Sequence, residues 1–202
     1  DLRTSSKYAP HNAMTSTESI LKVAKQKDYR TTSEVDSVLK YSVDEINLKD
    51  SNAKTAEMVT IPFSPSNSVE WDYDAESKTY KRYTRGIKEV EEETEEPVTA
   101  KNIIIEFIKN SDLEDDEDVG RQTLSNLGTY EGYYITNGKA IKITCEKTTR
   151  KSKTVYKDLD GNEINVNDGN TFVQICPKDA NVEIGEAEED EWQNGDLPSD
   201  LT

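Results

Sequence analysis

The chain has 202 residues, enough for one full-sized domain or two small ones, and either could bury a hydrophobic core. Hydrophobic and charged residues each make up 33% of the sequence, so part of the chain must lie outside any core. The net charge of -16 indicates a poor nucleic-acid binder, and no apolar run approaches the length of a transmembrane helix.

Residues 1–57 are predicted to form a helical lead-in that starts with irregular backbone around Ala9-Pro10-His11-Asn12. The sequence Thr15-Ser16-Thr17-Glu18 is typical of a capping box, with Thr15 as the cap and Glu18 bonding back to it. Apolar residues at helical spacing follow, so we expect a helix from Ser16 to Gln26. A weaker pattern from Thr31 to Leu39 predicts a short helical turn.

Residues 58–178 are predicted to form an antiparallel β domain, because the apolar period changes from 3.6 to 2 at Met58. Val59–Phe63 predicts an edge strand, since Pro62 has no amide hydrogen to donate to a ladder. Alternation on both sides of a polar turn predicts a hairpin over Ser68–Thr84. Asn102–Ile108 is the most apolar run and is expected to be the central buried strand.

Three segments without Lys or Arg hold about half of the acidic residues: Glu89–Glu96, Asp112–Asp118 and Asp179–Asp200. Runs of like charge are usually solvated loops or tails. Calcium binding by Asp112–Asp118 is the alternative, although the segment lacks the Gly that turns such a loop around an ion. We expect residues 179–202 to be an acidic, flexible and disordered tail.

The second half of the β domain is predicted to be a meander. Asn137-Gly138 between alternating segments is a strong hairpin signal, because both turn positions must reach positive φ. Further strands are expected between Thr154 and Pro177, with a turn at Asp158–Asn162. That turn contains an Asp-x-Asp-Gly sequence, but its spacing differs from that of a calcium-binding loop.

Metal, redox and triad chemistry have little support in the residue inventory. Cys145 and Cys176 lie in strand-like segments with no CxxC pair or zinc spacing, so we predict no cofactor and no metal. A disulfide between them is one alternative and two buried free thiols are the other. His11 is the single histidine, so any histidine-dependent catalysis would rest on it alone.

Several short motifs, taken in order, resemble those of the YerB-like bacterial lipoproteins, a family of unknown function. They are Ala-Pro-His-Asn before the helix, Ile61-Pro-Phe, Trp71-x-Tyr-Asp with Lys78-x-Tyr, Ala100-Lys-Asn-Ile-Ile, Asp160-Gly161 and Asn167-x-Gly-x-Thr-Phe-Val-Gln-x-x-Pro177. The resemblance runs from about Lys7 to Pro177. The chain departs from the family pattern in lacking a Trp near Cys145 and in its long acidic insertions.

The resemblance implies an extracytoplasmic protein of mainly Gram-positive bacteria, held on the outer face of the membrane by an N-terminal lipid anchor absent from this chain. It also implies that residues 1–57 are the remnant of a truncated N-terminal α/β domain. The expected fold class is α+β, with an N-terminal helical segment, a mainly antiparallel β-sheet domain and the disordered acidic tail. The family supplies no catalytic residues to carry over.

Candidate binding residues come from two places. His11 and Asn12 lie in irregular backbone before a capped helix, where loop residues can converge on a ligand or can satisfy local backbone groups. Trp71 and Tyr73 concentrate aromatic area on one hairpin, where they could form a binding face or pack in the core. Arg82 joins this set, although alternation places it on the solvated face.

The sequence supports two hypotheses of function. The first is a non-enzymatic lipoprotein ectodomain that binds peptidoglycan or an envelope protein, contacts the membrane through its anchor alone and binds no nucleic acid. The second is a cell-wall-acting enzyme or accessory subunit, which would need two carboxylates about 5–9 Å apart, one with a raised pKa.

Overall fold

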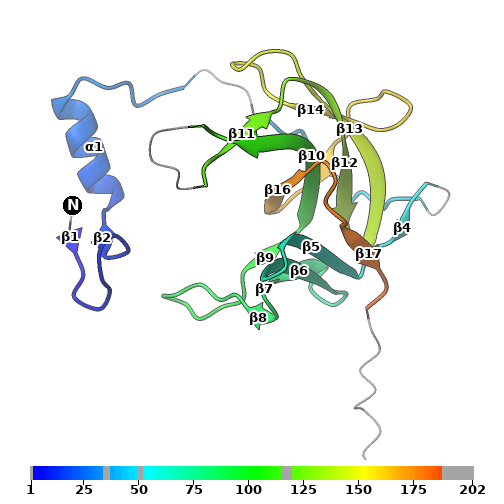
Figure 1. Ribbon diagram of the computed structural model, residues 1–202, viewed down its shortest axis with the longest axis horizontal. Coiled ribbons are helices and arrows are strands. Elements are labelled where there is room, and N and C mark those ends of the chain that lie inside the picture. The colour runs from blue at the N-terminus through cyan, green and yellow to red at the C-terminus, as the bar shows by residue number, and fades with distance from the viewer. Residues whose placement is uncertain (1, 34–36, 50–51, 115–119, 188–202) are drawn as a thin grey trace, which may run out of the picture. The chain divides into compact units, whose positions relative to one another are not determined.

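The structure is a computed structural model that describes residues 2–33, 37–49, 52–114 and 120–187 (Figure 1). The chain divides into two compact units, residues 1–37 and 38–202. In the first unit, β1 (Leu2–Arg3) pairs antiparallel with β2 (Ala13–Met14), and α1 spans Thr17–Gln26. Within the described residues this ten-residue helix is too short to cross a membrane.

The N-terminal cap of α1 lies one residue later than predicted. Ser16 has an extended backbone, with φ -129 and ψ 158, and its side chain accepts a hydrogen bond from the amide of Ser19 at 3.2 Å. Ser16 therefore takes the capping role that the sequence pattern gave to Thr15, and Glu18 lies within the first turn. The predicted helical turn at 31–39 falls partly outside the described residues, and its described positions are not helical.

The second unit contains two main sheets. The smaller sheet has the order β17-β5-β6-β7-β8, with β9 also paired to β7. Its antiparallel hairpin of β6 and β7 confirms the prediction for Ser68–Thr84. The strand bounds are β5 Met58–Ser64, β6 Asn67–Asp74, β7 Thr79–Thr84, β8 Ile87–Lys88, β9 Thr99–Ala100 and β17 Glu183–Gly185.

The larger sheet has the order β11-β10-β12-β13-β14, with β16 also paired to β10 and β4 also paired to β13. The β10–β16 pairing is parallel, whereas the other pairings in this sheet are antiparallel. A further parallel pair joins β15 (Val166–Asn167) to β3 (Tyr41–Ser42). The remaining bounds are β4 Lys54–Thr55, β10 Asn102–Asp112, β11 Gln122–Ser125, β12 Gly128–Thr136, β13 Lys139–Lys147, β14 Val155–Lys157 and β16 Thr171–Pro177.

Strand β10 separates the two hydrophobic cores, as its apolar sequence predicts. Alternate residues Ile103 and Ile105 face the first core, which also contains Val59, Trp71 and Tyr80 from the smaller sheet. Side chains on the opposite face of β10 join a second core, whose buried members are Ile104, Tyr134, Ile143, Cys145, Tyr156 and Val166. The larger sheet therefore contributes to a hydrophobic core on each of its faces.

The hairpin of β12 and β13 confirms the Asn137-Gly138 prediction. Asn137 has a φ of 49 and Gly138 a φ of 70, so both residues are left-handed as a tight two-residue turn requires. This short turn fixes the register over nine residue pairs, from Thr136↔Lys139 to Gly128↔Lys147.

Two predicted boundaries are corrected by the structure. Residues 38–57 belong with the β domain, because Ala56 lies in the first core and Leu48 packs against the second. The region predicted as a tail begins with β17, whose Ile184 packs against the first core and which pairs with β5 over Met58–Thr60. Pro62 lies beyond the end of that pairing, at a position where no described strand pairs with the outer edge of β5.

Candidate ligand-binding groove

The residues predicted to bind a ligand belong to two different units of the chain. Asn12 is occupied locally, since its side-chain oxygen accepts a hydrogen bond from Arg3 Nη1 at 2.8 Å and its carbonyl oxygen accepts one from the Thr4 amide. His11 is exposed in the same loop. Both residues belong to the first unit, whereas Trp71, Tyr73 and Arg82 belong to the second.

Trp71 is a core residue with no accessible surface. Its ring meets the Phe172 ring edge-on at a centroid distance of 5.0 Å, which joins the smaller sheet to β16 of the larger one. The ring is therefore unavailable to a ligand in this structure. Tyr73 is half-buried and packs against Tyr80, at a centroid distance of 5.1 Å.

Arg82 differs from its expected place on a solvated face. Its guanidinium lies 5.8 Å from the Trp71 ring and 5.2 Å from the Phe172 ring, and it forms an ion pair with Glu89. The acidic segment Glu89–Glu96 thus supplies the carboxylate that pairs with Arg82 at this edge of the core. Because burial and pairing already occupy its guanidinium, Arg82 does not present a free cation to a ligand.

The cysteines lie on opposite faces of the larger sheet. Cys145 on β13 belongs to the second core and Cys176 on β16 to the first, and both thiols are free and buried. Strands β10 and β12 lie between them, so their backbones are about 14 Å apart at ordinary strand spacing. That separation exceeds what a disulfide can bridge, and burial raises the pKa of Cys176 to about 12.

A gap in the pairing of β13 provides a more concrete site. On its outer edge, β13 pairs first with β4, at Lys139 and Ala140, and later with β14, from Thr144 to Glu146. Among the described residues, none pairs with the stretch between these two partners on that edge. The unpaired stretch is Ile141, Lys142 and Ile143.

The backbone of Lys142 points into this gap. The carbonyl oxygen of Gly138 accepts a hydrogen bond from the Ala56 amide, which lies on the β4 side. Backbone groups of alternate residues point to the same edge of a strand, so those of Ala140, Lys142 and Thr144 also face outward. Lys142 therefore offers one amide and one carbonyl group that no described strand uses.

Two turns keep the neighbouring strands from closing the gap. Before β4, the amides of Asn52 and Ala53 both donate to the carbonyl oxygen of Lys49 instead of to β13. After β14, Asp158 accepts hydrogen bonds from the amides of Asp160 and Asn162, as the predicted turn requires. Each turn removes the residue that would otherwise continue the pairing opposite Lys142.

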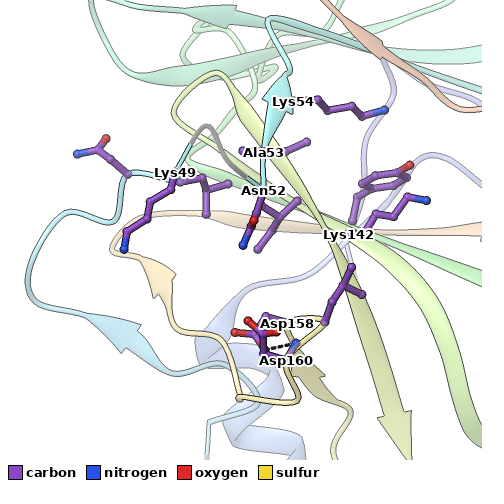
Figure 2. A pocket seen from close by; sticks show the side chains of 13 residues that line it. Lys49, Asn52, Ala53, Lys54, Lys142, Asp158 and Asp160 are labelled. Carbon is purple, nitrogen blue, oxygen red and sulfur yellow. Dashed lines mark hydrogen bonds between the residues drawn. The ribbon is translucent and has the colours of Figure 1, made fainter.

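The result is a groove of about 740 Å³, within the range of small-ligand sites. Leu48, Tyr133, Ile141 and Leu159 supply apolar surface, with Asn47, Ala53 and Ala140 beside them. Figure 2 shows Lys49 and Lys54 apart from each other on either side of Asn52, Lys142 on β13, and Asp158 and Asp160 together on the turn.

The electrostatics of the groove differ between its two ends. Lys54 Nζ lies 4.8 Å from the centre of the Tyr133 ring, a cation–π contact, and Tyr133 lies directly opposite Lys142 in the β12–β13 ladder. At the other end, hydrogen bonds from the turn, chiefly those of Asn162, lower the pKa of Asp158. This carboxylate therefore stays ionised well below neutral pH, so the turn remains a negative pole.

A buried polar network holds the segment that forms one wall. Asn167 Oδ1 accepts from the Ile46 amide at 2.6 Å, while Asn167 Nδ2 donates to the Ile46 carbonyl oxygen and to Thr136 Oγ1, both at 2.9 Å. Asn47, the next residue, already lines the groove. The wall is thus anchored to the sheet before it reaches the site.

A smaller depression of about 330 Å³ continues from the groove across β12 and β13. The two hollows share Tyr133, Lys142 and Leu159. Within the described residues, no group of three or more His, Cys, Asp or Glu side chains is arranged to hold a metal ion.

The sequence signals could not reveal this groove. The strand at 139–147 and the turn at Asp158–Asn162 are both predictable, but they become a site only through the register of β13 with β14 and with the distant strand β4. A lysine in an alternating strand otherwise indicates an ordinary solvated face.

Comparison with known proteins agrees with the fold. The family described as "Protein of unknown function (DUF3048) C-terminal domain" matches residues 59–173, more than half of the chain. The chain belongs to this family. The DUF3048 match includes Tyr133, β13 and the Asp158–Asn162 turn, whereas the wall residues 47–49 and 52–54 lie before it.

The chain is also similar to a curated relative, "Putative lipoprotein YerB" of Bacillus subtilis (strain 168). The two are 26% identical over 168 residues, which are 83% of this chain and 48% of YerB. The crystal structure of YerB from Bacillus subtilis matches with a TM-score of 0.73 at 24% identity, over 90% of this chain and 59% of that one. The chain thus spans about half the length of the relative, and the structural likeness shows a shared fold.

Proposed function

We propose that this chain is the non-enzymatic binding domain of an extracytoplasmic lipoprotein. The lipoprotein is held on the outer face of the cell membrane of a Gram-positive bacterium. In this role it binds a component of the cell envelope, either peptidoglycan or an envelope protein. The name of the relative YerB supports the placement. The observation that carries the binding role is the unpaired edge at Lys142, which lies in a groove with apolar and charged walls.

Co-sedimentation with purified peptidoglycan sacculi across a salt series tests this proposal. Lys142→Glu reverses a charge inside the groove, and Lys88→Glu makes the same change at an exposed site on β8 of the other sheet. We expect saturable binding that persists at about 0.2 M salt, where charges are screened within about 7 Å. We expect Lys142→Glu to lose that binding and Lys88→Glu to keep it.

The alternative outcomes have distinct meanings. Binding that disappears by about 0.2 M salt would be nonspecific charge attraction. Equal binding by the two variants would contradict the assignment of the groove. A complete lack of sedimentation would reject peptidoglycan and leave an envelope protein as the partner.

One observation keeps an enzymatic alternative in view. Burial, together with the nearby Glu70 carboxylate, raises the pKa of Asp72, and the two residues share a face of β6 about 7 Å apart at ordinary strand spacing. That separation falls within the range of paired glycosidase carboxylates. Release of soluble fragments from sacculi, abolished by Asp72→Asn, would support this alternative over binding alone.

A further inference from the structure

The groove has the length of a short peptide segment. The positions opposite Ile141, Lys142 and Ile143 lie between Lys54, which faces Ala140, and Lys157, which faces Thr144. Three extended residues span about 10 Å, and the ends of β4 and β14 close both sides. A long strand cannot continue through such a gap, whereas a free peptide of about three residues fits within it.

The chemistry of the floor matches a peptide backbone. The outward amide and carbonyl groups of Lys142 form the donor and acceptor pair that a neighbouring strand residue would use. Apolar surface from Tyr133 and Leu159 lies beside this pair, where it can contact small side chains. A sugar ring or an isolated anion would leave that paired donor and acceptor only partly satisfied.

The charges fix a direction for the peptide. Lys54 lies at the β4 end, opposite Ala140, and within the described structure it has no carboxylate partner. Asp158 and Asp160 lie at the β14 end (Figure 2). Because β13 runs from β4 toward β14, a peptide with its carboxylate near Lys54 and its amino group near Asp160 runs antiparallel to β13.

We infer that the groove binds a free, zwitterionic peptide of about three residues as an antiparallel strand paired with Lys142. This inference rests on the proposed binding function and deepens it by naming the ligand class. The end of a protein chain carries only one of the two end charges, so the source that we infer is a peptide released from the wall polymer.

Nuclear magnetic resonance of the full chain with the free tripeptide Ala-Val-Ala tests the pairing directly. We expect the Lys142 amide to shift and to become protected from hydrogen exchange on saturation. The amides of Ile141 and Ile143 already pair with β12 and should change little. An unprotected Lys142 amide at saturating peptide would overturn the inference.

Modified peptides test the two poles and the backbone bonds. Amidation of the carboxyl terminus, acetylation of the amino terminus and N-methylation of the central residue each remove one proposed interaction. We expect each change to weaken binding about tenfold or more, as loss of a charged or paired hydrogen bond does. Equal affinity for all four peptides would contradict the proposed orientation.

Protein variants provide matched controls for the same interactions. Lys142→Gln removes only the ammonium group, whereas Lys142→Pro also removes the outward amide, which β12 does not use. We expect Lys142→Pro to bind the tripeptide more weakly than Lys142→Gln. Lys54→Gln should weaken binding of the free acid but not of the amidated peptide, and Lys88→Gln should affect neither.

Assays with sacculi and with their released peptides test the source of the ligand. They also separate failure of the peptide inference from failure of the proposed function. Glycan-free peptides released from sacculi by an amidase should compete with Ala-Val-Ala, and failure to compete would reject the wall polymer as the source of the ligand. Groove-dependent sedimentation without any peptide binding would reject the peptide inference and leave the proposed function intact. Absence of both would reject both.

Discussion

Arg82 lies against the Trp71 ring, although the alternating pattern of its strand predicts that Arg82 is in solvent. The pattern of β6 and β7 predicts the burial of Trp71, but it also places Arg82 in solvent. In the structure the guanidinium lies near the Trp71 and Phe172 rings and pairs with Glu89. A long side chain can cover apolar surface while its charge is neutralised. The partner comes from a loop, which strand periodicity does not describe.

Asp74 gives a residue-scale prediction about pH. Hydrogen bonds from Lys81 Nζ at 2.5 Å and from the Ser77 and Glu76 amides lower the pKa of its carboxyl to about 2. A lowered pKa in the folded state means that ionised Asp74 stabilises the fold above its ordinary value near 3.8, and that this stability is lost as pH falls through about 2.

Urea unfolding at pH 6, 4, 3 and 2 measures this contribution. Asp74→Asn should be less stable than the natural chain at pH 6, and the difference should shrink between pH 4 and pH 2. Glu76→Gln, on the exposed part of the same turn, is the control and should change little. A difference between Asp74→Asn and the natural chain that is constant with pH would contradict the assignment.

At the scale of elements, Asn167 connects the sheet to the wall of the groove. Its side chain makes three hydrogen bonds, to both backbone groups of Ile46 and to Thr136. At about 1 kcal/mol for each bond, Asn167→Ala should lower the free energy of unfolding by about 3 kcal/mol. Hydrogen exchange should also accelerate in residues 44–49, because the wall loses its anchor.

Asn181→Ala is the matched control for that variant. Asn181 is exposed and makes a single long hydrogen bond, to Glu183 at 3.5 Å, so its removal should change stability by less than about 0.5 kcal/mol. Unchanged exchange in residues 44–49 of Asn167→Ala would show that the wall is held by other contacts.

Local elements were predictable where their signals were local. The central strand at Asn102–Ile108, the Asn137-Gly138 hairpin and the turn at Asp158–Asn162 each follow from adjacent residues. The parallel pairing of β10 with β16 joins residues about 70 positions apart and leaves no trace in either segment. Strand β17 was missed because its acidic composition resembles a tail, although pairing with β5 and burial of Ile184 stabilise it.

At the scale of the whole molecule, Trp71 joins the two sheets of the β domain. Trp71→Ala removes a fully buried ring from the first core and should lower the free energy of unfolding by about 3–5 kcal/mol. Trp71→Phe should be much milder, because the indole Nε1 is buried without a hydrogen-bond partner in the described structure.

Circular dichroism during urea unfolding measures both variants without relying on tryptophan fluorescence. Folded Trp71→Ala should still bind sacculi, since the ring does not reach the groove. If Trp71→Ala kept its stability but lost binding, Trp71 would be part of a binding surface, which would contradict its placement in the core.

The groove depends on how the whole β domain folds. Its residues come from the segment before β4, from β12 and β13, and from the turn after β14. Each part alone has an ordinary structural role, so the sequence directed attention instead to His11, Trp71 and Tyr73. Only the pairing register shows that Lys142 lies between the ends of two strands.

Photo-crosslinking in membranes of the source bacterium tests most directly whether the domain meets its ligand at the groove. A photoreactive amino acid replaces Leu159, an apolar groove residue that is 70% exposed, or Ile87, which is 69% exposed on β8 of the other sheet. We predict an adduct with an envelope component from position 159 alone, and its loss when Lys142→Glu is added. Equal adducts from both positions, or an adduct from position 87 alone, would contradict the account.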